Sequence, residues 1–161
     1  DQTLVGKNDT RKFINNMFRD GAGFKAQYES LPGPGERLIC LRNNRERGFL
    51  NGSLWKTVEA SEMKHGDVIS MIVPEDEPDV DANLILTPPQ YFVGDELELD
   101  WRVRKDADEF AYSYGITVHK SQGTQYNRVL VLDQSRVFKE DAAKWLYTAL
   151  TRAAERVTVL I

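Results

Sequence analysis

The stretch YGITVHKSQGTQYNRVLVL, residues 114–132, places a run of polar side chains between two apolar segments. FAYSYGIT, residues 110–117, which contains the first apolar segment, can form a strand, and RVLVLD, residues 128–133, has the apolar character of a buried strand. Thr117 can cap a short helix between them, with Lys120 near its start. Because a helix N-terminus presents free backbone N–H groups, the pattern predicts an anion site suited to phosphate. A helix start capped for structural reasons alone remains the alternative.

The N-terminal segment extends this stretch into an α/β pattern. TLVG, residues 3–6, predicts a strand. Thr10 could cap a helix over residues 11–20, which would end at Gly21 and Gly23. A strand followed directly by a helix is the unit from which parallel sheets are built.

The C-terminal segment repeats the alternation. Residues 139–156 predict a helix with one apolar stripe, and VTVLI, residues 157–161, predicts a final buried strand. At 100° per residue, Arg152 would lie beside Trp145 at the edge of the stripe, and Arg156 would project into it. We expect these arginines to face a neighbouring domain.

The middle of the chain, residues 31–103, has no helical period and reads as short strands between turns. ELELDWRV, residues 96–103, alternates apolar and polar side chains like a strand with one buried face. Asn51 and Gly52 can form a hairpin turn, and the polar, proline-rich residues 74–83 predict an exposed loop. Several short strands in this span predict a small β-barrel or sandwich.

Charge is unevenly distributed along the chain, whose net charge is −4. Residues 1–60 hold 10 basic and 7 acidic side chains, residues 61–110 hold 4 and 14, and residues 111–161 hold 7 and 4. The distribution fits an acidic insertion in a domain that binds a polyanion, and it equally fits a solvated acidic loop.

The cysteine and histidine content argues against a catalytic thiol and against a metal site. Cys40 is the only cysteine and lies in the apolar run LICL, so burial is more plausible than a catalytic thiol. With His65 and His119 as the only histidines, no Cys/His spacing predicts a metal site. No apolar run is long enough to span a bilayer, and the polar start lacks signal-peptide features, so a cytoplasmic protein is expected.

Two motifs give the chain a family resemblance. GITVHKSQGTQYNRVLVL resembles the fifth conserved motif of superfamily 1 helicases, and LYTALTRAAERVTVLI resembles the sixth, in the expected order. The HKSQG form and the preceding barrel-like segment are similar to the branch that contains RecD and the phage Dda helicase. The resemblance implies a second RecA-like domain (residues 1–30 and 104–161) with an inserted SH3-like β-barrel (residues 31–103), moving 5′ to 3′ on single-stranded DNA.

The fifth motif implies contacts with DNA. Thr117 would donate its hydroxyl to a phosphate, and the neighbouring residues would hold the backbone or shape the link to the nucleotide. The implied DNA-binding set is Thr117, His119, Lys120, Ser121 and Gln122. A core histidine satisfied by backbone groups is the alternative for His119.

The resemblance also implies a nucleotide site. Arg152 corresponds to the arginine finger that reaches the γ-phosphate, where its permanent charge stabilises phosphoryl transfer. Gly123 and Gln125 would lie near the nucleotide, although many relatives carry Glu at the position of Gln125, so ribose recognition is in doubt. Arg11 is a candidate second nucleotide contact, and a solvent-facing helix residue is its alternative.

Two parts of the ATPase machinery do not occur in these 161 residues. There is no G-x-x-x-x-G-K-[ST] loop and no acidic Mg²⁺-binding motif. The expected reading is therefore a C-terminal fragment of an ATP-dependent helicase. ATP, Mg²⁺ held by the first RecA-like domain, single-stranded DNA and nuclease or helicase subunits are its implied cofactors and partners. A non-catalytic nucleic-acid- or protein-binding module, or part of an RNA helicase, remains the alternative.

Overall fold

In the computed structural model, which describes all residues from Asp1 to Ile161, the chain divides into two units. Unit 1 comprises Asp1–Asn15 and Tyr114–Ile161, and unit 2 comprises Asn16–Ser113. None of the helices combines the length and the apolar character that a membrane span requires. The unit boundaries differ from the expected domain boundaries, and the assignment of residues 31–103 to an inserted domain stays a prediction.

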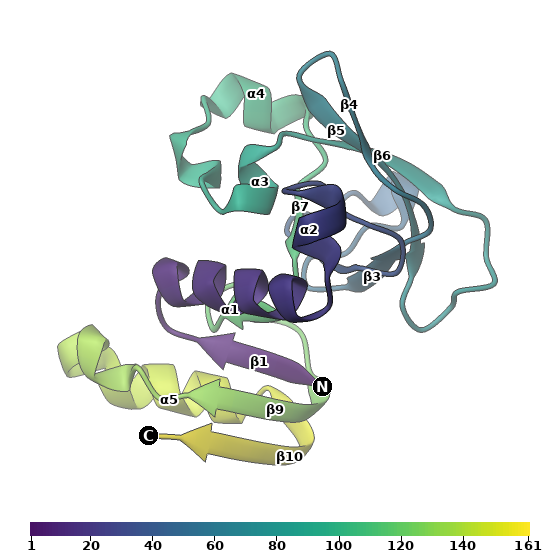
Figure 1. Ribbon diagram of the computed structural model, residues 1–161. Coiled ribbons are helices and arrows are strands. Elements are labelled where there is room, and N and C mark those ends of the chain that lie inside the picture. Colours follow the sequence, from purple (N-terminus) through teal and green to yellow (C-terminus); the bar gives the residue numbers. More distant parts are fainter. The chain divides into compact units, whose positions relative to one another are not determined.

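Unit 1 is built on a four-stranded sheet with the order β10-β9-β1-β8. Its strands are β1 (Gln2–Val5), β8 (Gly115–Thr117), β9 (Tyr126–Leu132) and β10 (Ala153–Leu160). Every pairing in this sheet is parallel, and Figure 1 shows the arrows of β1, β9 and β10 pointing the same way. Leu4, Ile116 and Val131 are fully buried in its core. The predicted α/β class with a parallel sheet is confirmed.

Helix α1 (Asn8–Gly21) follows β1 and packs against β8 through two contacts. The Asn15 side chain donates to the Gly115 carbonyl (3.2 Å) and accepts from the Gly115 amide (2.8 Å). A Cβ atom at Gly115 would lie 2.8 Å from Ile14 Cγ2, so only glycine allows this close approach.

The start of α1 corrects one prediction, because Thr10 lies inside the helix and does not cap it. The preceding loop is held instead by Gln134, whose Oε1 accepts from the amides of Gly6 (2.8 Å) and Lys7 (3.1 Å). The Gln134 amide nitrogen then donates to Thr10 Oγ1 (2.8 Å). A side chain far away in sequence therefore fixes the loop that enters α1.

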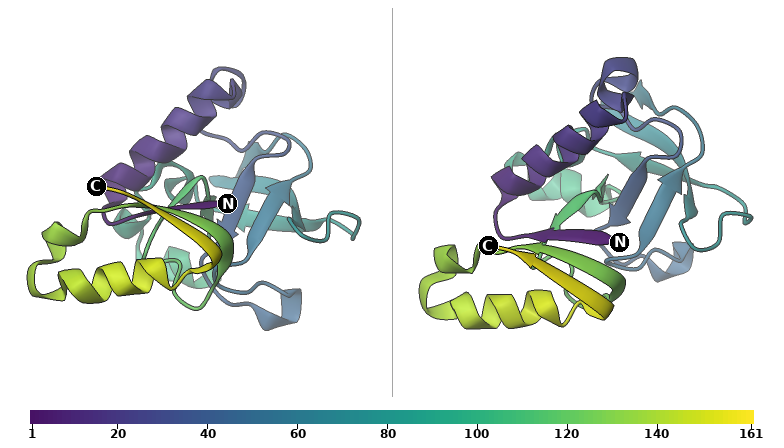
Figure 2. Two further views of the ribbon diagram at one scale, coloured as in Figure 1. Left: turned by 90° about the horizontal axis from the view of Figure 1, so that it is seen from below. Right: turned by 60° about the horizontal axis from the view of Figure 1, so that its bottom comes forward.

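The last helix is shorter than predicted. A 3₁₀ segment, η3 (Ser135–Asp141), leads into α5 (Ala142–Leu150), which lies along β9 and β10 in Figure 2. Pairing with β9 takes over from residue 153, and the Arg152 carbonyl already accepts from the Tyr126 amide (2.8 Å). Arg156 therefore lies on strand β10, not on the helix stripe, and β10 is largely exposed rather than buried.

Unit 2 contains six strands, all paired antiparallel. They are β2 (Arg37–Cys40), β3 (Leu54–Thr57), β4 (Glu62–Lys64), β5 (Asp67–Pro74), β6 (Asn83–Thr87) and β7 (Phe110–Tyr112). The order is β4-β5-β3-β2-β7, with β6 paired to β5. Residues 75–82 connect β5 and β6 as the predicted loop. The SH3-like identity of this sheet stays a prediction.

Two strand predictions in this region are wrong. Residues 96–103 form 3₁₀ helix η2 (Glu96–Glu98) and the start of α4 (Trp101–Asp106). Asp100 caps α4 by accepting from the Arg102 amide (2.8 Å), and Leu97 and Trp101 are 76% and 67% exposed. Secondly, FAYSYGIT is not one strand, because it divides into β7 and β8 in different sheets.

Turns and short helices complete unit 2. The short helices are α2 (Phe24–Tyr28), η1 (Arg45–Arg47) and α3 (Gln90–Val93). The predicted Asn51–Gly52 turn is present directly before β3, with Gly52 at φ 87°. A second turn, His65–Gly66, joins β4 to β5 with φ values of 54° and 92°, as a two-residue hairpin loop requires. The His65–Gly66 turn is not among the turns predicted from the sequence.

A buried ion pair joins the end of α1 to the segment before β2. Arg19 and Glu36 are 2% and 0% exposed, and Arg19 Nε lies 2.7 Å from Glu36 Oε1. Arg19 Nη2 completes a bidentate contact with Glu36 Oε2 (3.1 Å), and the guanidinium also donates to the carbonyls of Glu29 and Leu31. Its carbon lies 4.2 Å from the centre of the Tyr112 ring.

Cys40 is buried, as its sequence context predicted. Burial raises the pKa of the thiol to about 11, so at pH 8 the folded protein holds far less thiolate than an ordinary cysteine. We expect slow reaction with a disulfide reagent in the folded protein, rising about tenfold per pH unit from pH 7 to 9. In urea the thiol should react at once. Equally fast reaction with and without urea would contradict the burial.

Candidate functional site

The polar turn after β8 begins at Thr117, which is only 6% exposed. Its Oγ1 accepts from the Lys120 amide (3.4 Å), and its carbonyl accepts from the amides of Lys120 (2.9 Å) and Ser121 (3.2 Å). Residues 118–123 form successive turns rather than the predicted short helix. Because Thr117 Oγ1 accepts within the turn, its hydroxyl proton can still be donated to an anion.

The side chains that follow Thr117 divide between the surface and the interior. His119 and Gln122 are exposed, and neither side chain has a hydrogen bond within the chain. The core alternative for His119 is therefore wrong. Ser121 is fully buried, and its hydroxyl donates to the Val118 carbonyl (2.8 Å), which holds the turn together from inside. Lys120 is half-buried between these two groups of residues.

The far end of the same turn holds Arg152. Gly123 has φ 86°, a conformation that favours glycine, and the next carbonyl, that of Thr124, accepts from Arg152 Nη1 (3.2 Å). Arg152 also donates to the Thr148 carbonyl (3.2 Å) and to Thr151 Oγ1 (3.3 Å). All three acceptors are neutral, so no carboxylate in the chain balances the charge of this half-buried guanidinium. Such an arginine is suited to an anionic ligand.

Gln125 and Arg11, the other expected nucleotide contacts, lie in different environments. Gln125 is exposed beside Thr124 and can both donate and accept. Arg11 is 2% exposed in the first turns of α1, so the solvent-facing alternative is wrong. Its contact with a nucleotide stays a prediction, as do the other residue roles.

A hollow of about 230 Å³ lies beside His119 at the carboxyl edge of the sheet. Phe138 of η3 stacks on Trp145 of α5, with ring centres 5.3 Å apart and 14° between planes, and lies 5.8 Å from the His119 ring. The remaining lining residues are Val118, Gln122, Asp141, Lys144 and Thr148. Lys144 Nζ lies 2.8 Å from Asp141 Oδ1, which lowers the pKa of Asp141 and raises that of Lys144.

Trp145 is the unusual member of this hollow. It is 5% exposed, and its buried Nε1 has no hydrogen-bond partner in the chain. A buried donor without an acceptor costs about 1–3 kcal/mol. The sequence placed Trp145 on an apolar stripe, but Phe138 was missed because its approach to His119 depends on the turn of η3.

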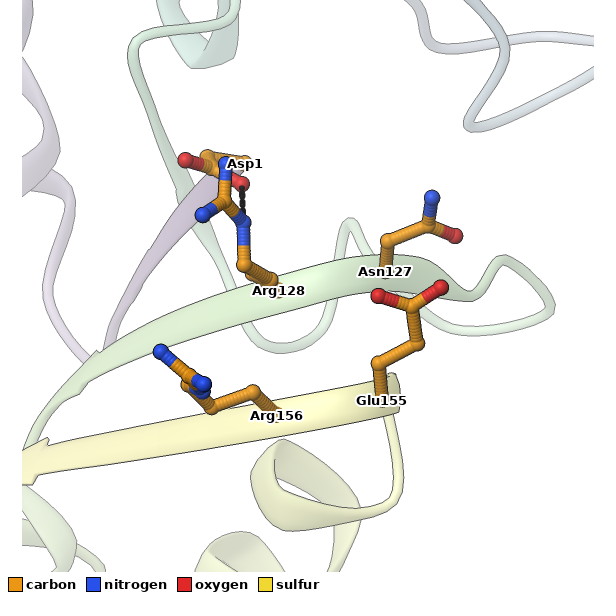
Figure 3. Close-up of a pocket in the computed structure, with 5 residues that line it drawn as sticks. All are labelled: Asp1, Asn127, Arg128, Glu155 and Arg156. Atoms are coloured by element: carbon orange, nitrogen blue, oxygen red, sulfur yellow. Dashed lines mark hydrogen bonds and ion pairs between the residues drawn. The ribbon is translucent and has the colours of Figure 1, made fainter.

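A second hollow, of about 530 Å³, lies at the opposite edge of the sheet, where β9 and β10 begin (Figure 3). Arg128 on β9 and Arg156 on β10 are register partners, and Arg128 Nε lies 2.7 Å from Asp1 Oδ1. Asn127 and Glu155 complete the lining. Two carboxylates accompany the two arginines, so this hollow has no clear preference for one sign of charge.

Residues 112–160 match the family model described as the UvrD-like helicase C-terminal domain. A 56-residue segment, 35% of this chain, is 38% identical to an uncharacterized protein of Methanocaldococcus jannaschii and covers 5% of that protein. The first of these matches confirms that the C-terminal part of the chain resembles superfamily 1 helicases.

Solved helicase structures share the fold over almost the whole chain. The Pif1 helicase from Candida albicans matches 99% of this chain with a TM-score of 0.54 and 13% identity, and 45% of that protein is covered. A Bacteroides Pif1 helicase, solved in complex with ADP-AlF3 and ssDNA, matches 99% with a TM-score of 0.57 and 16% identity, and 40% of it is covered. The chain thus spans less than half the length of these helicases.

Proposed function

We propose that this chain supplies the second RecA-like domain, with the arginine finger, of an ATP-dependent DNA helicase of the RecD and Dda branch. One observation carries the proposal. Arg152 is held by three neutral oxygens beside the turn that contains Gly123 and Gln125, with its charge unbalanced. A guanidinium placed in this way can stabilise the negative charge that develops as the γ-phosphate is transferred.

The turn from Thr117 to Thr124 would connect two polyanions. At its first end, the Thr117 hydroxyl, His119 and Lys120 would hold DNA phosphates, which gives binding without sequence preference. At its other end, the Thr124 carbonyl orients Arg152. Ser121, buried between the ends, keeps the turn rigid. A displacement of the turn at Thr117 would therefore also move the Thr124 carbonyl that orients Arg152.

The nucleotide would be ATP with Mg²⁺. Arg152 suits its terminal phosphate and Gln125 could hydrogen-bond its sugar, whereas the Mg²⁺ ligands would come from a first RecA-like domain of the same polypeptide. The metal would help to neutralise charge on the transferred phosphoryl group. The 5′ to 3′ direction and partner helicase or nuclease subunits form part of the proposal through the resemblance to the RecD and Dda branch.

The isolated chain of residues 1–161 is expected to bind single-stranded DNA but to hydrolyse ATP no faster than a control preparation, because it has no phosphate-binding loop. The full-length protein should hydrolyse ATP and be stimulated by single-stranded DNA. Turnover by the isolated chain well above the control would contradict the assignment to a second domain. A full-length protein that binds DNA without hydrolysing ATP would contradict the proposal of an ATP-dependent helicase.

Gln125 favours a second candidate, a nucleic-acid-binding module that keeps the fold and has lost turnover. An amide cannot form the charge-assisted bond to a ribose hydroxyl that a carboxylate forms. The unbalanced charge of Arg152 argues for the motor, because a pure binding module does not need an arginine beside the nucleotide. Competition between matched DNA and RNA strands separates the DNA helicase from an RNA helicase, and preference for RNA would overturn the substrate assignment.

A further inference from the structure

We infer that the outer face of the sheet in unit 2 is a docking surface for a basic, amphipathic helix of a protein partner. This surface, called here the β5–β6 face, consists of five apolar side chains and the acidic loop of residues 75–82. The apolar members are Val58, Ile69, Met71, Leu84 and Leu86. The contacts proposed for DNA and ATP all involve residues of unit 1, so the inference goes beyond the proposed function and does not depend on it.

The strand register brings the five apolar side chains together. Met71 pairs with Leu84 and Ile69 pairs with Leu86 across β5 and β6, which run side by side in Figure 1. The Val58 amide donates to the Met71 carbonyl (2.8 Å), so Val58 continues the pairing of β3 with β5. Directly paired residues point to the same side of a sheet, as do alternate residues of one strand. All five side chains therefore project from one face.

This apolar face is open to solvent. Val58, Leu84 and Leu86 are 51%, 49% and 44% exposed, whereas Val68 and Ile72, on the opposite face of β5, are fully buried. An antiparallel sheet with one covered face commonly carries polar side chains on its open face, and a strand that is apolar on both faces is typical of a sheet covered on both sides. An exposed apolar cluster of this kind marks an interaction site.

The backbone of β6 excludes one way of covering the face. Asp108 occupies the outer edge of β6, because its Oδ2 accepts from the Leu86 amide (3.0 Å) and its own amide donates to the Leu86 carbonyl (3.0 Å). Arg47 donates to the Leu84 carbonyl. A partner therefore cannot extend the sheet at these residues by adding a strand. The apolar stripe of an amphipathic helix needs no backbone contact and can pack on the side chains of the face.

Charge decides which helix fits the face. The loop of residues 75–82 joins β5 to β6 at the end of the face that holds Met71 and Leu84. It carries no basic side chain, and four of its acidic side chains are exposed without a partner in the chain: Asp76, Glu77, Asp79 and Asp81. Such carboxylates attract lysine and arginine side chains of a partner. A helix with an apolar stripe and basic residues beside it complements both parts of the surface.

The same charge excludes the phosphate backbone of DNA as the occupant. Unit 2, residues 16–113, holds 11 basic and 19 acidic side chains, whereas unit 1 holds 10 basic and 6 acidic ones. A polyanion is repelled by an acidic surface and attracted to a basic one. Unit 2 would therefore recruit a protein, while unit 1 holds the nucleic acid.

The test uses the full-length protein and two labelled synthetic peptides of equal leucine and lysine content. In one peptide the leucines form a single helical stripe, and in the other their order is scrambled so that no stripe forms. Fluorescence anisotropy should show the striped peptide binding at least tenfold more tightly. Leu84→Ser combined with Leu86→Ser should weaken its binding about tenfold, because less apolar surface is buried. Glu77→Gln combined with Asp79→Asn should weaken it about threefold and reduce its dependence on salt.

Matched controls lie in the same unit. Leu97→Ser changes an exposed leucine outside the face, and Glu98→Gln combined with Asp106→Asn removes two exposed carboxylates outside the loop, so neither should alter peptide binding. The variant with both leucines replaced should still bind single-stranded DNA like the parent, which would show that it is folded.

Three results would overturn the inference. The first is that the striped peptide does not bind, or binds no better than the scrambled one. The second is that replacing Leu84 and Leu86 leaves its binding unchanged, or abolishes DNA binding, which would identify a nucleic-acid surface. The third is a dimer in sedimentation velocity that the same double change dissociates, which would make a second copy of the chain the occupant.

Discussion

Replacing Arg152 with alanine in the full-length protein is expected to lower DNA-stimulated ATP turnover by about 10³-fold or more, a loss of about 4 kcal/mol of transition-state stabilisation. An arginine finger acts on charge that appears only during phosphoryl transfer, so nucleotide binding should fall far less than kcat. Steady-state ATP hydrolysis with saturating single-stranded DNA, together with a nucleotide-binding titration, separates the two effects.

Two further variants sharpen the Arg152 experiment. Arg152→Lys keeps the charge but loses the planar, multiply donating head that reaches the Thr124 and Thr148 carbonyls, so it should restore little of the rate. Arg156→Ala removes an exposed arginine from neighbouring β10 and should leave turnover near the parent value. Turnover in Arg152→Ala within a few-fold of the parent would show that the finger assignment is wrong.

Replacing Arg19 with alanine is expected to lower the free energy of unfolding by about 3–5 kcal/mol, because it leaves Glu36 buried without its partner. The change also removes the donors to the Glu29 and Leu31 carbonyls and the cation over the Tyr112 ring. Urea unfolding followed by far-UV circular dichroism measures the loss. Domains of this size have a total free energy of unfolding of about 5–15 kcal/mol, so a loss of this size is a large fraction of the stability.

A matched ion pair serves as the control for Arg19. Arg128 pairs with Asp1 at the same 2.7 Å separation, but the two side chains are 59% and 64% exposed. Arg128→Ala should therefore cost at most about 1 kcal/mol. The double change Arg19→Met with Glu36→Leu should recover the part of the loss that comes from the unpaired Glu36 charge, since apolar side chains can replace a buried pair. It should not recover the part that comes from backbone groups, because the Glu29 and Leu31 carbonyls and the Gly33 amide lose their partners. An Arg19→Ala protein as stable as the Arg128→Ala protein would show that the buried Arg19–Glu36 pair contributes no more to stability than the exposed pair.

Sequence patterns predicted the parts of this fold that depend on local signals. The strand before Gly6 and the strand after Asn127 are apolar runs bounded by turn residues, and the structure contains both, whereas the short helix predicted after Thr117 is a series of turns. The residues of the candidate site could also be predicted from sequence, because the HKSQG and TALTRA motifs are continuous in the chain. The roles of those residues came from family resemblance rather than from pattern.

Predictions failed where distant contacts decide the local structure. The last helix ends at Leu150 because parallel pairing with β9 captures the following residues, although the sequence continues with good helix formers. Residues 101–106 are helical although apolar and polar side chains alternate around Trp101. Arg42 donates to the carbonyls of Arg104, Lys105 and Ala107 at the end of that helix, a contact across about sixty residues that no local pattern contains.

The aromatic hollow lay beyond sequence reasoning for a related reason. Trp145 reads as one more apolar position in a helix, and nothing near it in sequence reveals that its N–H will have no acceptor. Only the backbone reversal at Lys139, with φ 48°, brings Phe138 between the tryptophan and His119. A non-glycine residue in this conformation is strained and rarely foreseen from sequence.

The position of β10 at the end of its sheet has a consequence for handling the protein. Only one side of this strand is hydrogen-bonded, to β9, so the other presents a row of unsatisfied amides and carbonyls. Val157 and Val159 on the strand are 39% and 37% exposed. An open edge of this kind invites a second molecule to pair with it. Concentrated samples of residues 1–161 are therefore expected to self-associate through β10, and Val159→Lys is expected to reduce this self-association.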